Sequence, residues 1–130
     1  MGDLTPFRPR YNRPMEDKHL KIRIAHGTTV AMGPGKALLL EAIGRCGSIS
    51  AAAKDMGMSY RRAWELVDVM NRSFTTPLVD TFPGGGKQGG ARVTELGLHV
   101  LASYRALAVK IASSCAPELD AISRHLAVDT

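Results

Sequence analysis

The pattern of apolar and polar residues over 60–74 has the period of an amphipathic helix. Ala63, Val67 and Met70 recur on one face, and the charged residues fall mainly on the other. Ser59 stands just before this stretch, where its hydroxyl can accept a hydrogen bond from a free backbone N–H. The pattern therefore predicts a capped helix with a buried face and a basic, polar leading end.

A shorter helix is predicted immediately upstream, between Ser48 and Gly57. The alanines at 51–53 keep it thin enough for a neighbouring helix to lie across it. Gly57 is expected to end it, because the last position of a helix often needs a positive φ. Met56 and Met58 flank the turn and would fill the space beneath it. A short helix, a glycine turn and a second helix are typical of a helix-turn-helix.

Elements that precede this pair are predicted from two further patterns. Residues 20–24 alternate apolar and polar side chains, and a turn at 26–27 with a return over 29–31 would complete a hairpin. Gly33-Pro34 is a favourable helix opening, and the apolar residues of 35–45 form a helical stripe after it.

A second hairpin is predicted after the helix pair. Residues 78–82 and 91–94 have the character of short strands, and the intervening 83–90 is rich in glycine. Its position after a helix-turn-helix predicts a wing, with Lys87 and Gln88 reaching a phosphate or the minor groove. The alternative is a surface loop with an incidental lysine.

A long helix is predicted over 94–112, with Thr94 as its cap. Its apolar stripe is larger than one small domain covers, so part of it is expected to face a second copy of the chain. The positions predicted for this dimer contact are Leu96, Val100, Tyr104, Leu107 and Ile111. A short final helix is predicted over 117–126.

Composition and charge favour a polyanionic partner only moderately. The 130 residues carry 17 lysines and arginines against 12 acidic residues, a formal net charge of +5. Six of the basic residues precede Ile24, in or near a proline-containing segment. Residues 1–18 are thus expected to be a flexible basic arm, with Arg8, Arg10 and Arg13 available to phosphates. The alternative is a solvated tail, or a terminus docked on a partner subunit.

Several classes of function find no support in the sequence. Cys46 and Cys115 lie far apart, neither has metal-ligand spacing, and no nucleophile–base–acid set is present. The Gly-Pro-Gly-Lys stretch at 33–36 is not a nucleotide phosphate loop, because Val30 occupies the place of the required first glycine. No apolar run has the length of a membrane span. We expect a cytoplasmic protein that is not an enzyme and needs no cofactor or metal.

The stretch SISAAAKDMGMSYRRAWELVDVMN, residues 48–71, resembles the N-terminal domain of the ModE family of molybdate-responsive regulators. The wider helix-turn-helix is similar to that of LysR-type regulators, and the resemblance extends over about residues 38–107. It implies a winged helix-turn-helix that binds DNA as a dimer through the long C-terminal helix. Full-length members carry molybdate-binding domains after this one, whereas this chain ends at Thr130, so molybdate sensing is not carried over.

The predicted fold class is mainly α with a small β-hairpin: a winged helix-turn-helix with an extra N-terminal strand or hairpin and a long dimerisation helix. The predicted domains are the arm 1–18, the winged domain 19–112 and a short helix and tail over 113–130. We expect a transcription regulator that binds a pseudo-palindromic operator in double-stranded DNA as a homodimer, with its effector unknown. The alternatives are an oxyanion-responsive (molybdate) sensor and a winged-helix protein-interaction module.

DNA contact is predicted mainly at the leading end of the 59–74 helix. Arg61 and Arg62 can each grip a guanine with two hydrogen bonds, although one of them is expected to contact only phosphate. Trp64 is expected to pack between helix and wing rather than to touch DNA. The residues predicted to contact DNA are Ser48, Ser50, Ser59, Tyr60, Arg61, Arg62, Lys87 and Gln88.

Overall fold

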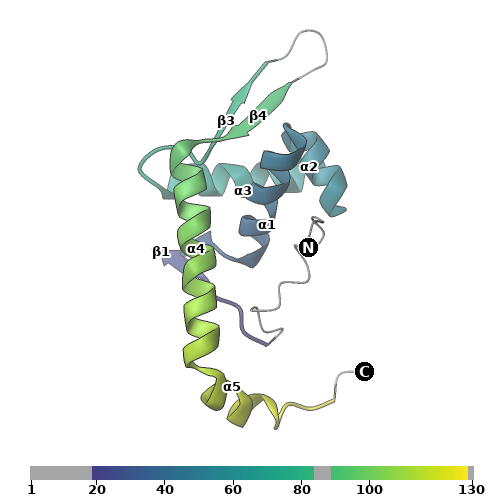
Figure 1. Cartoon of the computed structure of the whole chain (residues 1–130). Helices are drawn as coiled ribbons and strands as arrows, with labels where there is room; N and C mark the ends of the chain where they lie inside the picture. The colour runs from purple at the N-terminus through teal and green to yellow at the C-terminus, as the bar shows by residue number, and fades with distance from the viewer. Residues whose placement is uncertain (1–18, 84–88, 129–130) are drawn as a thin grey trace, which may run out of the picture. The chain divides into compact units, whose positions relative to one another are not determined.

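The computed structural model describes residues 19–83 and 89–128, which are mainly helical with two small antiparallel sheets (Figure 1). The described residues fall into two compact units, one within residues 22–104 and the other made of residues 19–21 with 105–128. In chain order the described elements are β1 (Ile24–His26), β2 (Thr29–Met32), α1 (Pro34–Cys46), α2 (Ile49–Met56), α3 (Tyr60–Ser73), β3 (Val79–Phe82), β4 (Gly90–Val93), α4 (Glu95–Ser114) and α5 (Ala116–Ser123).

The core of the 22–104 unit lies where α1, α2 and α3 pack on one another, with β4 against α1 and β2 against α3. The predicted apolar face of α3 is confirmed, because Ala63, Val67 and Met70 are all buried. Helix α1 begins at Pro34, as predicted, and buries Leu39, Leu40 and neighbouring apolar residues. Burial of these side chains supplies most of the free energy that holds the helices together.

The connection between α2 and α3 forms as the sequence predicts. At the opposite end of α2, the Ser48 hydroxyl accepts from the Ala51 N–H at 3.1 Å and caps the helix, a role that the sequence analysis did not assign. Gly57 ends α2 with a φ of 71°, a left-handed conformation that favours glycine. The Ser59 hydroxyl accepts from the Arg62 N–H at 3.0 Å and so begins α3. The turn is therefore set at one end by the left-handed backbone of Gly57 and at the other by the Ser59 cap.

The first hairpin differs from the predicted one. Residues 20–23 are not in a strand; β1 begins at Ile24 and pairs with β2, around a turn in which Gly27 has a φ of 63°. The alternation over 20–24 has another cause, since Ile22 is partly buried against the core. The Ile22 carbonyl accepts from the Tyr104 hydroxyl at 2.7 Å, so this carbonyl is hydrogen-bonded to a side chain of α4 and not to a neighbouring strand.

The second hairpin, β3–β4, agrees with the predicted strands to within one residue at each end. Its register pairs Val79 with Val93 and Phe82 with Gly90. The predicted wing contacts Lys87 and Gln88 lie outside the described residues, as does the predicted basic arm 1–18.

Helix α4 contributes its first half to the core of the 22–104 unit. Leu96 and Val100 pack partly buried against the core cluster, and Tyr104 is 6% exposed. Tyr104 was predicted to face a second copy of the chain, but its ring packs within its own unit and its hydroxyl is bonded to Ile22. Leu107 and Ile111 belong to the other unit, and the pairing of two copies stays a prediction.

The other unit contains the second half of α4 and the short helix α5. Helix α5 has Pro117 in its first turn and ends at Ser123, earlier than the predicted 126. Ile122 is 65% exposed and Leu126 is 53% exposed. Among the described helices, none combines the length and the apolar character that crossing a bilayer needs.

Candidate nucleic-acid interface

The leading end of α3 is accessible on the surface of the 22–104 unit. Tyr60 is 55% exposed, the Arg61 side chain is 87% exposed, and Arg62 is also exposed. The Ser59 cap fixes the backbone from which these side chains project. A rigid helix end with two guanidinium groups has the chemistry needed to meet phosphates or the base edges of a DNA groove.

Two ion pairs lie along the exposed side of α3. The Arg61 Nε lies 3.4 Å from the Glu65 carboxylate, and the Arg72 Nε lies 3.0 Å from the Asp68 carboxylate. Both pairs have the spacing of one helical turn, at which exposed pairs contribute only a few tenths of a kcal/mol. The charge of Arg61 is therefore partly compensated, whereas among the described residues no ion pair joins Arg62.

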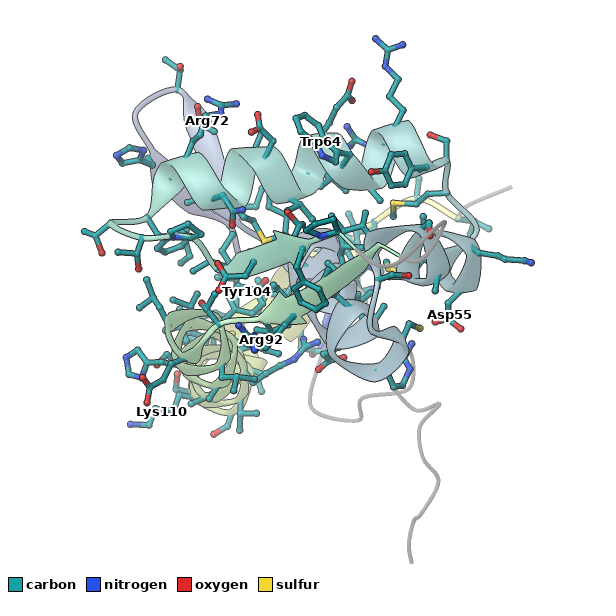
Figure 2. All side chains as sticks on the ribbon, turned by 90° about the horizontal axis from the view of Figure 1, so that it is seen from above. Asp55, Trp64, Arg72, Arg92, Tyr104 and Lys110 are labelled. Carbon is teal, nitrogen blue, oxygen red and sulfur yellow. The ribbon has the colours of Figure 1, made fainter. Side chains whose placement is uncertain are left out.

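Trp64 is more exposed than predicted. Its side chain is 48% exposed and stands on the surface of α3, where Figure 2 shows it with Arg72 further along the helix. About half of its surface is thus not covered by any packing, and packing between helix and wing stays a prediction for the other half. Trp64 follows Tyr60 by one helical turn, so the two aromatic side chains lie on the same side of α3.

The predicted serine contacts have different local roles. Ser48 and Ser59 are the caps of α2 and α3, and each hydroxyl accepts a backbone hydrogen bond. Each still has its own proton to donate, so capping does not exclude a contact to phosphate. Ser50 is exposed in the first turn of α2.

A groove that sequence analysis missed lies beside α3. It has a volume of about 440 Å³ and is lined by residues of β2, of the start of α1 and of α3. Lys36 and Arg62 both line it. Burial lowers the pKa of Lys36 below its usual value, and repulsion from Arg62 and Arg23 lowers it further. One feature of the sequence could have indicated this site: Lys36 lies in the first turn of a predicted helix, where acidic residues are favoured.

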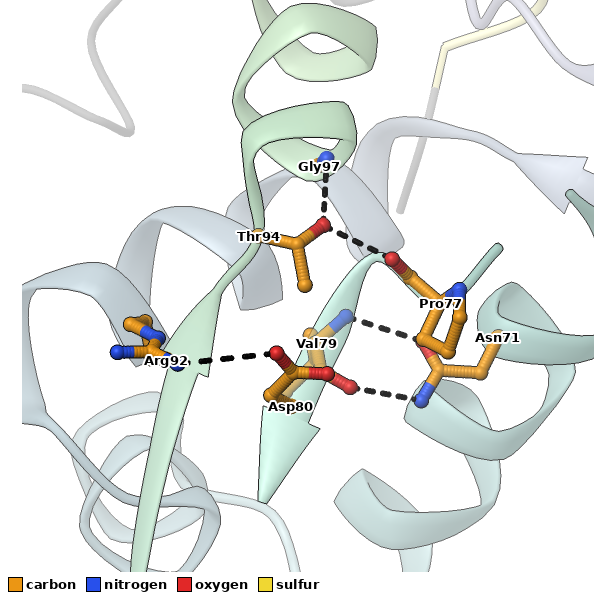
Figure 3. Close-up of polar contacts among 7 residues, drawn as sticks. All are labelled: Asn71, Pro77, Val79, Asp80, Arg92, Thr94 and Gly97. Carbon is orange, nitrogen blue, oxygen red and sulfur yellow. Dashed lines mark hydrogen bonds and ion pairs between the residues drawn. The ribbon is translucent and has the colours of Figure 1, made fainter. Parts of the chain in front are cut away.

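Polar contacts at the far end of α3 hold the helix to the second hairpin (Figure 3). The Asn71 side-chain oxygen accepts from the backbone N–H groups of Leu78 at 2.9 Å and Val79 at 3.1 Å. Its amide nitrogen donates to the Val79 carbonyl at 3.0 Å. One side chain thus satisfies three backbone groups at the start of β3, and sequence analysis gave it no role.

Thr94 makes the matching connection where the hairpin enters α4. Its hydroxyl donates to the Pro77 carbonyl at 2.8 Å and accepts from the Gly97 N–H at 3.0 Å, as Figure 3 shows. The predicted cap is therefore confirmed, and it also joins the start of α4 to the residues before β3. These contacts fix the strands relative to α3.

Side chains on the strands themselves are also packed together. The Arg92 guanidinium lies 5.9 Å from the centre of the Phe82 ring and 3.8 Å from the Asp80 carboxylate. A Cβ on Gly90 would lie only 2.2 Å from an atom of that ring. Glycine is thus required opposite Phe82 while the ring keeps this position.

Within the described parts of the chain, no group of three or more His, Cys, Asp or Glu side chains is placed to hold a metal ion. No protein-family model matches the chain. Similarity to individual proteins is found at the level of sequence.

The chain is 41% identical over 96 residues to the molybdenum transport protein ModE of Azotobacter vinelandii. It is 40% identical over 75 residues to the DNA-binding transcriptional dual regulator ModE of Escherichia coli. It is also 45% identical over 85 residues to the molybdenum-pterin-binding protein MopB of Rhodobacter capsulatus. Its homologues are ModE and Mop proteins.

These matches cover 74%, 58% and 65% of this chain respectively. They cover 34%, 29% and 32% of the relatives, so the chain spans about a third of the ModE and Mop proteins it matches. The ModE relatives are described as a molybdenum transport protein, a transcriptional regulator and a DNA-binding transcriptional dual regulator, and ModE is also the family that residues 48–71 resemble.

Proposed function

We propose that this chain is a ModE-related transcription regulator that binds double-stranded DNA. In this proposal α2 and α3 form the helix-turn-helix, and β3–β4 form the wing. The leading end of α3 enters the major groove. The observation that carries the proposal is the exposed set Tyr60, Arg61 and Arg62 on a helix end fixed by the Ser59 cap.

The chain acts as a homodimer in this proposal. A dimer places two copies of α3 on half-sites about one DNA turn, roughly 34 Å, apart. The other unit leaves several apolar side chains exposed, including Leu107, Val109 and Ile122. In this proposal they form the surface that contacts the second copy of the chain. A two-fold protein predicts a pseudo-palindromic operator.

The proposal includes no catalytic reaction and no cofactor, and it places the protein in the cytoplasm with DNA. The description of the Escherichia coli relative as a DNA-binding regulator supports it over the protein-interaction alternative. The Mop relatives are described as molybdenum-pterin-binding, but the match covers less than a third of each. Equilibrium dialysis with molybdate tests the oxyanion-sensor alternative, and retention of molybdate by the purified chain would support it.

Selection from a random DNA pool by the purified protein tests the function. The proposal predicts enrichment of one pseudo-palindromic motif, with half-sites about 10 base pairs apart. Recovery of no motif, together with no salt-dependent binding to any duplex, would contradict it.

A further inference from the structure

Three cationic side chains from separate parts of the chain lie near the start of α1. Lys36 lies in the first turn of α1, and Arg62 lines the same groove from α3. Arg23 reaches this place from just before β1, because a Cβ on Gly33 would lie 3.5 Å from the Arg23 Cγ. Repulsion from both arginines contributes to the lowered pKa of Lys36. Packing alone brings these charges together, since the residues are far apart in the sequence.

Lys36 occupies a position that is unfavourable for a cation in three independent ways. It is partly buried, it faces two like charges, and it lies at the positive end of the α1 dipole. The first turn of α1 contains no acidic residue, and Gly33 provides no side-chain cap. A bound anion would offset these costs, because it neutralises the like charges and can accept from the backbone N–H groups that follow Pro34 in the first turn.

The carboxylates in the groove do not supply this anion. Glu65 and Asp68 both line it, but each is paired with an arginine on α3, at 3.4 Å and 3.0 Å respectively. In the described part of the chain, no ion pair joins Lys36 or Arg62. The α1 end of the groove therefore keeps an excess of positive charge, and a volume of about 440 Å³ accommodates a phosphate group with several waters.

We propose that the α1 end of this groove binds one backbone phosphate of the DNA duplex that α3 enters, with Lys36 and Arg62 as its ligands. The inference rests on the proposed function and adds a contact from α1, outside the α2–α3 pair. A duplex is favoured over a free anion because Arg62 belongs to the leading end of α3, next to Arg61. Of the two arginines, Arg62 then contacts a phosphate, and Arg61 contacts the edges of bases.

The experiment compares the unmodified chain with Lys36→Gln, Lys36→Arg and the charge-matched control Lys110→Gln, which changes an exposed residue of α4. Fluorescence anisotropy titrations with a selected operator and with a random duplex are made over a series of salt concentrations. Lys36→Gln is expected to weaken binding to both duplexes equally, by about fivefold near physiological salt. The slope of log K against log salt concentration falls by about 0.9, the value for one phosphate. Lys36→Arg keeps the slope, and Lys110→Gln changes neither quantity.

A thermal melt of Lys36→Gln distinguishes loss of a contact from loss of fold. The melting temperature should rise, because a repelled cation has been removed, while DNA affinity falls. Unchanged affinity and slope for Lys36→Gln, in a protein that does bind DNA, would overturn the phosphate contact and leave the proposed function standing. Failure of the unmodified chain to bind any duplex would overturn both.

Inorganic phosphate serves as the probe for the other source of the anion. Two results together would assign the site to a free oxyanion. Millimolar phosphate would raise the melting temperature of the unmodified chain but not of Lys36→Gln, and the two proteins would bind DNA equally. That result would overturn the DNA contact. Protection by phosphate together with the loss of DNA affinity would support it.

Discussion

The Asn71 side chain is bonded to the backbone of Val79 in both directions. Its oxygen accepts from the Val79 N–H at 3.1 Å, and its nitrogen donates to the Val79 carbonyl at 3.0 Å. At Val79, the first residue of β3, the Asn71 amide makes the two hydrogen bonds that a neighbouring strand would make. These bonds hold the end of α3 against the second hairpin. In the proposed function this connection sets the position of the wing relative to the recognition helix.

Asn71→Ala is expected to destabilise the fold, because it leaves the N–H groups of Leu78 and Val79 without their acceptor. Both residues are buried, so the cost should be about 1–3 kcal/mol in the free energy of unfolding. Urea denaturation followed by circular dichroism measures it. Asn71→Asp keeps the acceptor for both N–H groups but sets a carboxylate oxygen against the Val79 carbonyl, so its cost falls as the pH is lowered and the carboxylate is protonated. Equal stability of Asn71→Ala and the unmodified chain would show that the contact is not structural.

Gly97→Ala should also destabilise the fold, although alanine is the better helix former. A Cβ on Gly97 would lie 2.3 Å from the Leu78 carbonyl oxygen and 2.7 Å from the Val93 side chain, so backbone has to move. Gly44→Ala is the matched control, because its Cβ would meet only the Val93 side chain at 3.9 Å. The control should gain about 0.5–1 kcal/mol. Thermal melts of the two variants should therefore shift in opposite directions, and a stabilised Gly97→Ala would contradict the packing described.

Glu65→Gln should strengthen DNA binding severalfold. The carboxylate of Glu65 is paired with Arg61 at 3.4 Å, and it would also repel phosphates near the α3 surface. Anisotropy titration at low salt should show the gain, which shrinks as salt screens the charges. Glu118→Gln, which removes an exposed acid of α5, is the control and should leave affinity unchanged. Weaker binding by Glu65→Gln would indicate instead that this carboxylate contacts a base.

The stability difference between Lys36→Gln and the unmodified chain should depend on pH. The pKa of Lys36 is lowered in the folded protein, so the charged side chain destabilises the fold at neutral pH. As pH rises through the lowered pKa toward the usual 10.5, the folded state loses this proton before the unfolded state does. The advantage of Lys36→Gln should therefore be full near pH 7 and shrink above the lowered pKa. Melting curves of both proteins over this range test the effect, and a constant difference would show that the charge of Lys36 is not the cause.

Elements set by local chemistry were predictable from the sequence. Gly57 and Ser59 set the turn between α2 and α3 through contacts within a few residues, so their roles could be predicted without the fold. Features set by packing were not predictable in this way. The alternation at 20–24 resembled that of a strand. In the structure the Ile22 side chain packs against the core, and its carbonyl accepts a hydrogen bond from the Tyr104 hydroxyl.

The candidate site shows the same division. Tyr60, Arg61 and Arg62 were predicted because a capped helix displays its first turn. The groove was missed because Lys36 and Arg62 come together only when α1 packs beside α3. The exposure of Trp64 was also missed, since a preference for burying tryptophan does not say which flank of α3 the fold leaves open.

Comparison of two charge-matched double variants tests the central claim most directly. Arg61→Ala with Arg62→Ala removes two charges from the leading end of α3, and Lys110→Ala with Arg124→Ala removes two from the other unit. Anisotropy titrations of the selected operator should show affinity lowered by about tenfold or more for the first pair, with circular dichroism unchanged, and little change for the second. Equal affinities for the two variants would contradict the assignment of DNA binding to α3.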